Sequence, residues 1–196
     1  MPVLTKMKVL LIMFAPHKAF QMQIGALSAF LKKCGYKVRY LEIIVYTGDR
    51  FDKYKQIVKE EIQEFQPDLV GFSSYDMNYY FILDCANFIK NLYPGMKIIV
   101  GGHNASLAPG DYMKFESIDY VCIGEGEYVL KDLLESFSQG KSVKSIEGLC
   151  SRDDKGKALF NNARDLIENL DGLQFVDRTV DKSIDNSGQL YTDHLP

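Results

Sequence analysis

Four short segments of the sequence carry residue types that bind ligands, and each one follows an apolar run. They span residues 15–20, 73–78, 101–109 and 124–127. Histidines and carboxylates can bind metals or transfer protons, whereas glycines let a ligand approach the backbone closely. The candidate binding residues in these segments are Pro16, His17, Ser73, Ser74, Tyr75, Gly101, Gly102, His103, Asn104, Gly124, Glu125, Gly126 and Glu127.

The glycine-containing segments allow two interpretations each. Gly101-Gly102 permits close approach of a ligand or of another backbone, but a glycine pair is equally typical of a plain turn into a helix. Gly124 and Gly126 flank the start of a helical pattern, where backbone N–H groups are available to an acceptor, although the adjacent acids disfavour a phosphate. Glu127 suits the first turn of that helix, whereas Glu125 precedes it.

The serines and histidines are weaker signals. Ser73 and Ser74 follow a strand pattern, and helix capping is the expected role for serines in that position. His17 is a candidate metal ligand or base, but no partner acid lies near it in the sequence. The three histidines form no recognisable nucleophilic constellation with serine or cysteine. Independent catalysis by this chain is therefore not predicted.

Apolar runs of strand length alternate with segments of helical spacing, in a βα rhythm repeated five times. The predicted strands are 8–14, 37–44, 68–73, 97–100 and 119–123. The predicted helices are 20–34, 51–65, 78–92, 107–115 and 127–137. Mostly continuous apolar strands indicate burial on both faces of a parallel sheet.

This pattern predicts an α/β fold of the flavodoxin-like, or Rossmann-like, doubly wound type. Right-handed crossovers and the commonest order for five parallel strands give 2-1-3-4-5. Ligands of such sheets bind outside the carboxyl ends of the strands, here near strands one and three. All four candidate segments are expected at that edge.

The last third of the sequence departs from the βα rhythm. Residues 1–140 are predicted to form the main domain. Residues 141–162 form a terminal hairpin extension, with strands at 147–152 and 157–161 around a polar turn. Residues 163–196 are predicted to be a connector, and the part from 181 onward is polar, without periodicity, as in a tail.

Composition excludes several classes of protein. The 196 residues are 46% hydrophobic and 25% charged, as in an ordinary single globular domain. A net charge of −3 disfavours nucleic-acid binding. No stretch approaches the roughly 20 apolar residues that span a bilayer, so membrane insertion is not predicted. Four widely spaced cysteines are expected to be reduced core thiols. The apolar run at 9–15 is short and no small-residue cleavage site follows it, so a secretory signal is not predicted and a cytoplasmic location is expected.

Several ligand classes of this architecture lack their motifs here. No Gly-x-Gly-x-x-Gly or Walker loop follows the first strand, so dinucleotide and nucleoside-triphosphate binding lose their main support. The same loop has neither the acids of a phospho-acceptor receiver nor the hydroxyl-rich loop of a flavodoxin.

Taken together, the sequence resembles the N-terminal cobalamin (vitamin B12)-binding domain of the cobalamin-dependent radical SAM enzyme family. The most specific match is Ile-Asp-Tyr-Val-Cys-Ile-Gly-Glu-Gly-Glu at 118–127. The other matching segments are 8–16, 25–31, 34–38, 67–73, 101–103, 146–149 and 169–178, so the resemblance covers nearly the whole chain.

The resemblance implies how cobalamin would bind. The corrin is expected on the carboxyl edge of the sheet, with the nucleotide tail between the sheet and its helices. Matching lining positions are Ser73, Gly101, Gly102, His103, Gly124, Glu125 and Gly126. Methionine-synthase-like domains use Asp-x-His-x-x-Gly to place a histidine on cobalt, but residues 15–20 lack the acid and the glycine. Base-off cobalamin without a protein histidine ligand is therefore expected, with coordination by His17 as the alternative.

The Cys-x-x-x-Cys-x-x-Cys signature of radical SAM catalysis does not occur in this sequence. The chain is thus expected to be an excised or separately encoded domain that binds cobalamin. SAM and a 4Fe-4S cluster are expected only in a radical SAM barrel, in cis or in trans, that performs methyl transfer or related radical chemistry.

Two alternatives remain open at this point. One is a flavodoxin-like interaction or regulatory module that no longer binds a cofactor. The other is a small enzyme that uses His17, His103 and Glu125 as acid–base groups.

Overall fold

The computed structural model describes residues 6–17, 22–45, 53–185 and 189–191. Within these residues, the strands form one sheet in the order β7-β6-β5-β4-β3-β1-β2-β8-β9. The five strands of the predicted βα units are parallel to one another: β1 (Lys8–Ala15), β2 (Lys37–Ile44), β3 (Leu69–Ser73), β4 (Lys97–Gly101) and β5 (Tyr120–Cys122). Their order, 2-1-3-4-5, confirms the prediction.

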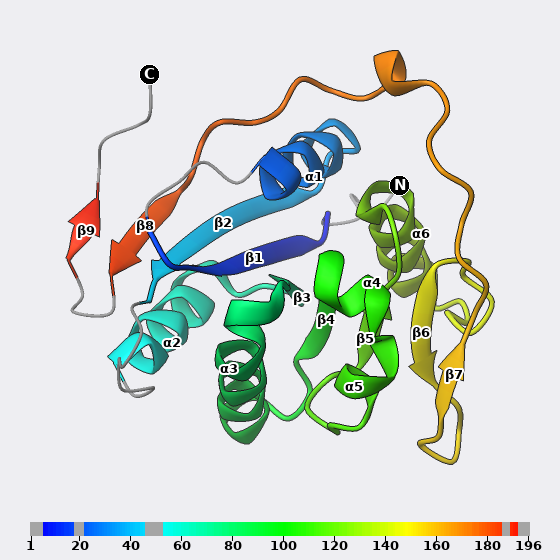
Figure 1. Cartoon of the computed structure of the whole chain (residues 1–196), viewed down its shortest axis with the longest axis horizontal. Helices are drawn as coiled ribbons and strands as arrows, with labels where there is room; N and C mark the ends of the chain where they lie inside the picture. Colours follow the sequence, from blue (N-terminus) through cyan, green and yellow to red (C-terminus); the bar gives the residue numbers. More distant parts are fainter. Residues whose placement is uncertain (1–5, 18–21, 46–52, 186–188, 192–196) are drawn as a thin grey trace.

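Helices cover both faces of the sheet, as the doubly wound architecture requires (Figure 1). One face carries α1 (Met22–Lys33) and α6 (Gly126–Gln139). The other carries α2 (Lys53–Phe65), α3 (Tyr79–Leu92), α4 (His103–Leu107) and α5 (Pro109–Met113). The predicted starts of the first two helices, at residues 20 and 51, lie outside the described residues.

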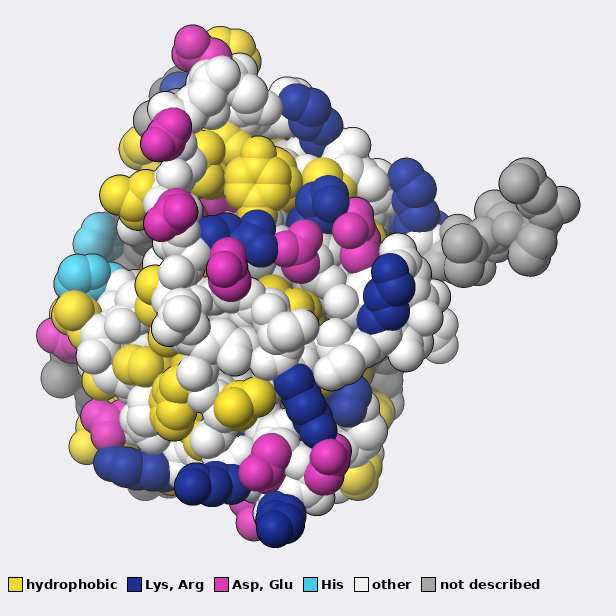
Figure 2. All heavy atoms as spheres, turned by 90° about the vertical axis from the view of Figure 1, so that its right-hand side faces the viewer, with side chains coloured by type: hydrophobic (Ala, Val, Ile, Leu, Met, Phe, Trp, Pro, Cys, Tyr) yellow, Lys and Arg dark blue, Asp and Glu magenta, His cyan; other side chains and the backbone are white. Residues whose placement is uncertain are grey.

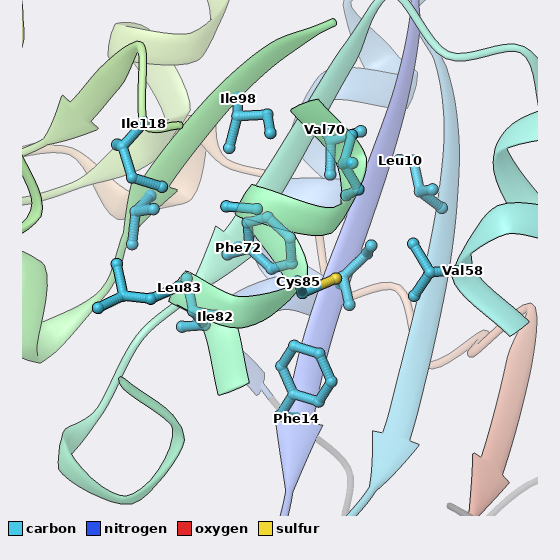
Figure 3. Packing of buried hydrophobic residues seen from close by; sticks show 14 of the residues in the cluster. Leu10, Phe14, Val58, Val70, Phe72, Ile82, Leu83, Cys85, Ile98 and Ile118 are labelled. Carbon is cyan, nitrogen blue, oxygen red and sulfur yellow. The ribbon is translucent and has the colours of Figure 1, made fainter. Parts of the chain in front are cut away.

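The face toward α2 and α3 is filled with large side chains. In β3, Val70 and Phe72 point toward this side, where Ile82 and Cys85 of α3 meet them (Figure 3). Phe14 at the end of β1 packs edge-on against Tyr54 of α2, with 4.9 Å between ring centroids. Alternate residues of each strand therefore build a closed apolar core on this face.

The face toward α1 and α6 has a residue without a side chain, Gly71, in the middle of the sheet. Leu11, Gly71 and Ile99 are direct register partners across β1, β3 and β4. Because Gly71 has no side chain, it leaves a narrow gap between the two aliphatic residues, in which a Cβ would lie 3.0 Å from Leu11 Cδ2. The gap at Gly71 faces α1 and α6, and it is continuous with the space beside the turns that follow the strands.

The structure has two short helices in the region where the sequence predicts one. The sequence predicted a single helix at 107–115, but α4 starts at His103 and α5 at Pro109. Proline lacks an N–H and disfavours helical geometry in the residue before it, so Ala108 adopts φ −134° and the helix breaks there. The first of the two helices, α4, begins directly after the Gly101-Gly102 turn.

The predicted hairpin is confirmed as β6 (Leu149–Arg152) and β7 (Ala158–Phe160), which extend the sheet antiparallel from β5. The predicted tail is not structureless, because β8 (Lys182–Asp185) adds a parallel strand to β2 and β9 (Leu190–Tyr191) pairs with β8. Side chains hold this added strand. Lys182 pairs with the buried Glu61, and Ser183 donates a hydrogen bond to Glu42 over 2.7 Å.

Between the hairpin and β8, the connector passes over α6 and α1 (Figure 1). Arg164 forms an ion pair with Asp132 of α6, and Asp177 accepts a hydrogen bond from Lys32 of α1 over 2.6 Å. The connector is thus fastened to the two helices that cover the gap at Gly71.

The outer surface shows mixed charge. On the side occupied by α6 and the hairpin, Lys and Arg side chains alternate with Asp and Glu rather than forming a patch of one sign (Figure 2). Among the described residues, no helix has the length and apolar character of a membrane span.

Candidate functional site: a cavity at the carboxyl edge of the sheet

A cavity of about 860 Å³ opens where β1, β3, β4 and β5 end and continues between the sheet and helices α1 and α6. Its lining includes nearly every residue predicted from the sequence. These are Pro16, His17, Ser73, Ser74, Tyr75, Gly101, Gly102, His103, Gly124, Glu125, Gly126 and Glu127. The size falls within the range of about 300 to 1,000 Å³ that is usual for cofactor sites.

The Gly101-Gly102 turn brings two backbones together. Gly102 has φ +96°, and a Cβ there would lie 2.7 Å from the carbonyl oxygen of Ser74. The Ser74 N–H in turn donates to the Gly101 carbonyl over 2.7 Å. Both interpretations left open by the sequence hold at Gly102, because another backbone approaches it closely and it is also the N-cap residue of α4.

The turn after β5 is tied to the helix that follows β4. Gly124 has φ +79°, and its N–H donates to Ser106 Oγ over 3.0 Å. The Ser106 hydroxyl donates to the Gly102 carbonyl over 2.9 Å. The N–H of Gly124, which the sequence left available to a ligand, is therefore used within the protein.

The expected capping role of the serines is wrong. Tyr75 occupies the N-cap position of the 3-10 turn η1 (Asp76–Asn78), and Asn78 occupies that of α3. Ser74 is buried and shares a hydrogen bond with the Tyr112 hydroxyl. The Ser73 hydroxyl is half-buried and, in the described part of the chain, makes no hydrogen bond, so it can serve a ligand.

Asn104 does not line the cavity. Its side-chain amide donates to the Tyr112 hydroxyl over 3.1 Å, and its backbone N–H donates to the Ser74 carbonyl over 3.2 Å. Asn104 therefore fastens α4 to the turn after β3, behind the surface that a ligand would meet.

Tyr75 fixes the turn after β3 against the end of β1. Its hydroxyl donates to the Phe14 carbonyl over 2.9 Å, and Asn78 donates to the same carbonyl over 3.3 Å. Burial, together with the charge of Glu42, raises the pKa of Tyr75 to about 12. The phenol is thus neutral at physiological pH and remains a donor.

The two glutamates have different surroundings. Glu127 lies in the first turn of α6, as predicted, and burial raises the pKa of its carboxyl, with a further contribution from Glu125. Glu125 is exposed, and its carboxylate accepts a hydrogen bond from the Ile167 N–H of the connector over 2.7 Å. One predicted ligand contact is therefore also a contact that holds the connector.

The two predicted histidines lie at the mouth. His17 follows β1 and His103 begins α4, and both are exposed. Within the described ranges, no group of three or more His, Cys, Asp or Glu side chains is arranged to hold a metal ion.

The deep part of the cavity was missed by sequence reasoning. It and the adjoining walls include Leu11, Met13, Gln23, Ile24, Leu27, Gly71, Phe72, Ile99, Ser106, Cys122 and Leu130. A Cβ on Gly71 would lie 3.0 Å from Leu11 Cδ2 and 3.5 Å from Ile99 Cγ2. The available signal was the isolated glycine inside a strand pattern, which indicates close approach. Burial raises the pKa of Cys122 to about 12, so this wall residue is a neutral thiol.

The fold and the site together define a doubly wound α/β domain with a ligand cavity at the switch between β1 and β3. Its mouth offers peptide groups and a hydroxyl, and its deep arm is apolar. Such a division suits a large ligand that places polar groups at the mouth and an apolar part in the arm.

The sequence matches the B12 binding domain family over residues 15–134, which is more than half of the chain. The chain therefore belongs to this family and is a cobalamin-binding domain. The resemblance to the cobalamin-binding domains of cobalamin-dependent radical SAM enzymes, predicted from the sequence, is confirmed.

Two relatives with known sequences illustrate the match. An uncharacterized methyltransferase from Pyrococcus horikoshii is 33% identical over 113 residues, covering 57% of this chain and 24% of the relative. Cytidylyl-2-hydroxyethylphosphonate methyltransferase from Streptomyces wedmorensis is 27% identical over 172 residues, covering 79% and 32%.

The solved structure shares the fold. It is the cobalamin-dependent S-adenosylmethionine radical enzyme OxsB with aqua-cobalamin and S-adenosylmethionine bound, and it superposes with a TM-score of 0.69 at 23% identity, covering 83% of this chain and 23% of OxsB. This chain thus spans about a quarter to a third of the length of the relatives it matches.

Proposed function

We propose that this chain holds base-off cobalamin for a cobalamin-dependent radical SAM enzyme. In this proposal the SAM and 4Fe-4S chemistry, methyl transfer or a related radical reaction, belongs to a radical SAM barrel in cis or in trans. Membership of the B12 binding domain family and the methyltransferase relatives support the proposal. Bound cobalamin would supply a cobalt ion that can carry a methyl group or an electron.

The observation that carries the proposal is the continuity between the glycine turns and the arm at Gly71. The turns at Gly102 and Gly124 present backbone to the mouth, and Ser73 adds a hydroxyl with no partner among the described residues. Corrin amides need such polar groups. Leu11 and Ile99, with Gly71 between them, offer an apolar arm that suits the benzimidazole ring at the end of the nucleotide tail.

The base-off state without a histidine ligand is part of the proposal. A histidine that ligates a metal normally donates its other ring N–H to a carboxylate or carbonyl, which fixes its orientation. The His17 ring is exposed at the mouth and has no such acceptor among the described residues. We propose that His17 borders the cofactor without coordinating cobalt.

The proposed function also implies a division of the chain into three parts. Residues 1–140 would form the cofactor domain, 141–162 the hairpin extension and 163–196 the connector toward the radical SAM barrel, with β8 of this last segment joined to the sheet beside β2. A cytoplasmic location is supported by the four cysteines, which are all thiols in the structure.

The test is retention of hydroxocobalamin. Purified protein is mixed with the corrinoid, unbound ligand is removed by gel filtration, and the visible spectrum of the protein fraction is recorded. The expected result is retained corrinoid with a base-off spectrum, unchanged in a His17→Ala variant. A histidine-on spectrum that is lost in His17→Ala would contradict the ligand assignment, and absence of retained corrinoid would contradict binding by this chain alone.

A further inference from the structure

The turns that form the mouth of the cavity are joined to one another in series. The Ser74 N–H donates to the Gly101 carbonyl over 2.7 Å, which links the turn after β3 to the turn after β4. Ser106 then links the turn after β4 to the turn after β5, because its hydroxyl donates to Gly102 and accepts from Gly124. Among the described residues, this hydroxyl is the hydrogen-bonded link between the last two turns.

The need for such a link follows from the sheet. β4 and β5 share a short parallel ladder, in which Ile99 pairs with Tyr120 and Val100 with Val121. Beyond Val100 and Val121 the two strands leave the ladder and lead into their glycine turns. Both turns require positive φ, +96° at Gly102 and +79° at Gly124, and a Cβ on Gly124 would meet nothing within 4 Å. Packing therefore does little to fix the position of Gly124.

We propose that Ser106 is a positioning residue for cobalamin, because its hydroxyl sets the spacing between the Gly102 and Gly124 turns that border the cofactor. This inference rests on the proposed function. Ser106 acts through the two backbones that it joins, so its removal loosens the binding surface without removing any part of the fold's core.

The first variant is Ser106→Ala, which leaves the Gly124 N–H without its acceptor. We expect hydroxocobalamin affinity to fall by up to roughly tenfold, since the net contribution of one hydrogen bond corresponds to a factor of that order, mainly through faster dissociation. The visible circular dichroism of the bound corrin should weaken, because the ring is held in a less defined orientation. Ser106→Thr keeps the hydroxyl and should restore both the affinity and the spectrum.

The chain offers a matched control. Ser138 of α6 donates to the carbonyl four residues earlier, Leu134, over 2.9 Å, the same local bond that Ser106 makes to Gly102. Ser138 does not line the cavity and joins no turns. Ser138→Ala should therefore leave affinity and dichroism at the wild-type values.

A second measurement examines the link without cofactor. Amide hydrogen exchange at Gly124 should be faster in cofactor-free Ser106→Ala than in the wild type or in Ser138→Ala. Wild-type affinity and dichroism in Ser106→Ala would overturn the inference while leaving the proposed function intact, and so would failure of Ser106→Thr to restore them. If the wild type binds no corrinoid, the proposed function fails, and faster exchange at Gly124 then shows a structural link with no role in cofactor binding.

Discussion

The two faces of the sheet are built from alternate residues of the same strands, yet one is closed and the other is hollow. On the closed face, β3 contributes Val70 and Phe72, which meet the apolar side of α3. On the hollow face, the intervening residues are Gly71 and Ser73, and the cavity continues past them toward α1 and α6. Large side chains on one face and their omission on the other allow a single strand to serve both stability and binding.

This comparison separates two kinds of substitution. Changes on the closed face should lower the free energy of unfolding with little effect on cobalamin affinity. Changes to residues that line the cavity on the hollow face should mainly lower cobalamin affinity.

The largest effect is expected for Ile82→Ala in α3. Ile82 is fully buried on the closed face, so its truncation removes apolar contacts and leaves a cavity. The free energy of unfolding should fall by about 3.5 kcal/mol, measured by urea denaturation without cofactor. Hydroxocobalamin affinity, measured well below the unfolding transition, should stay within about twofold of the wild type. A parallel loss of affinity would show that the two faces are not independent.

The next largest effect is expected for Gly71→Val on the hollow face. The new Cβ would lie 3.0 Å from Leu11 Cδ2, so the valine side chain would push Leu11 aside and extend into the cavity, while valine itself suits a strand. Cobalamin affinity should fall at least roughly 100-fold, or about 2.8 kcal/mol, in equilibrium titrations. Gly95→Ala is the control, since a Cβ at Gly95 meets nothing within 4 Å. Wild-type affinity in Gly71→Val would show that the deep arm is not part of the cobalamin site.

A smaller effect is expected for Asp177→Asn in the connector, which covers the hollow face. Burial alone would raise the pKa of Asp177, but hydrogen bonds from Lys32 and Thr179 outweigh it and lower that pKa. A lowered folded-state pKa means that the charged side chain stabilises the fold above its unfolded pKa, near pH 4, and that this contribution is lost as the pH falls through the folded value.

The variant should therefore lose about 0.5 kcal/mol at pH 7, allowing for screening of this partly exposed pair. The difference from the wild type should vanish on acidification. Urea denaturation of both proteins between pH 7 and pH 3 measures this, and a difference that grows toward low pH would contradict the assigned role.

The smallest effect is expected for His17→Ala. Because the ring has no orienting acceptor among the described residues, we expect cobalamin affinity to change by less than about twofold. The measurement is an equilibrium titration with hydroxocobalamin. A large loss would make His17 part of the cofactor site rather than its border.

The fold was largely predictable because its strands are long apolar runs. The prediction for 37–44 coincides with β2, since that strand is buried along nearly its whole length. β8 was not predictable from local pattern, because Lys-Ser-Ile-Asp is short and polar. It forms a strand through distant partners, such as Glu61 and Tyr40, whose N–H donates to Asp181 over 2.8 Å.

The mouth of the site was predictable and its interior was not. The turns carry glycines and polar residues at strand ends, which is a local signal. Leu11 and Ile99 look like ordinary core residues until the register sets them beside Gly71. Ser106 is an unremarkable helical serine whose role depends on Gly124, 18 residues away.

The most direct test of cobalamin binding on the hollow face is a crystal structure of the chain with hydroxocobalamin. The predicted result is density for the corrin against the turns at Gly102 and Gly124, with the nucleotide tail extending past Gly71 and no His17 nitrogen on cobalt. A corrin bound elsewhere, or an arm at Gly71 closed by protein side chains in the complex, would contradict it.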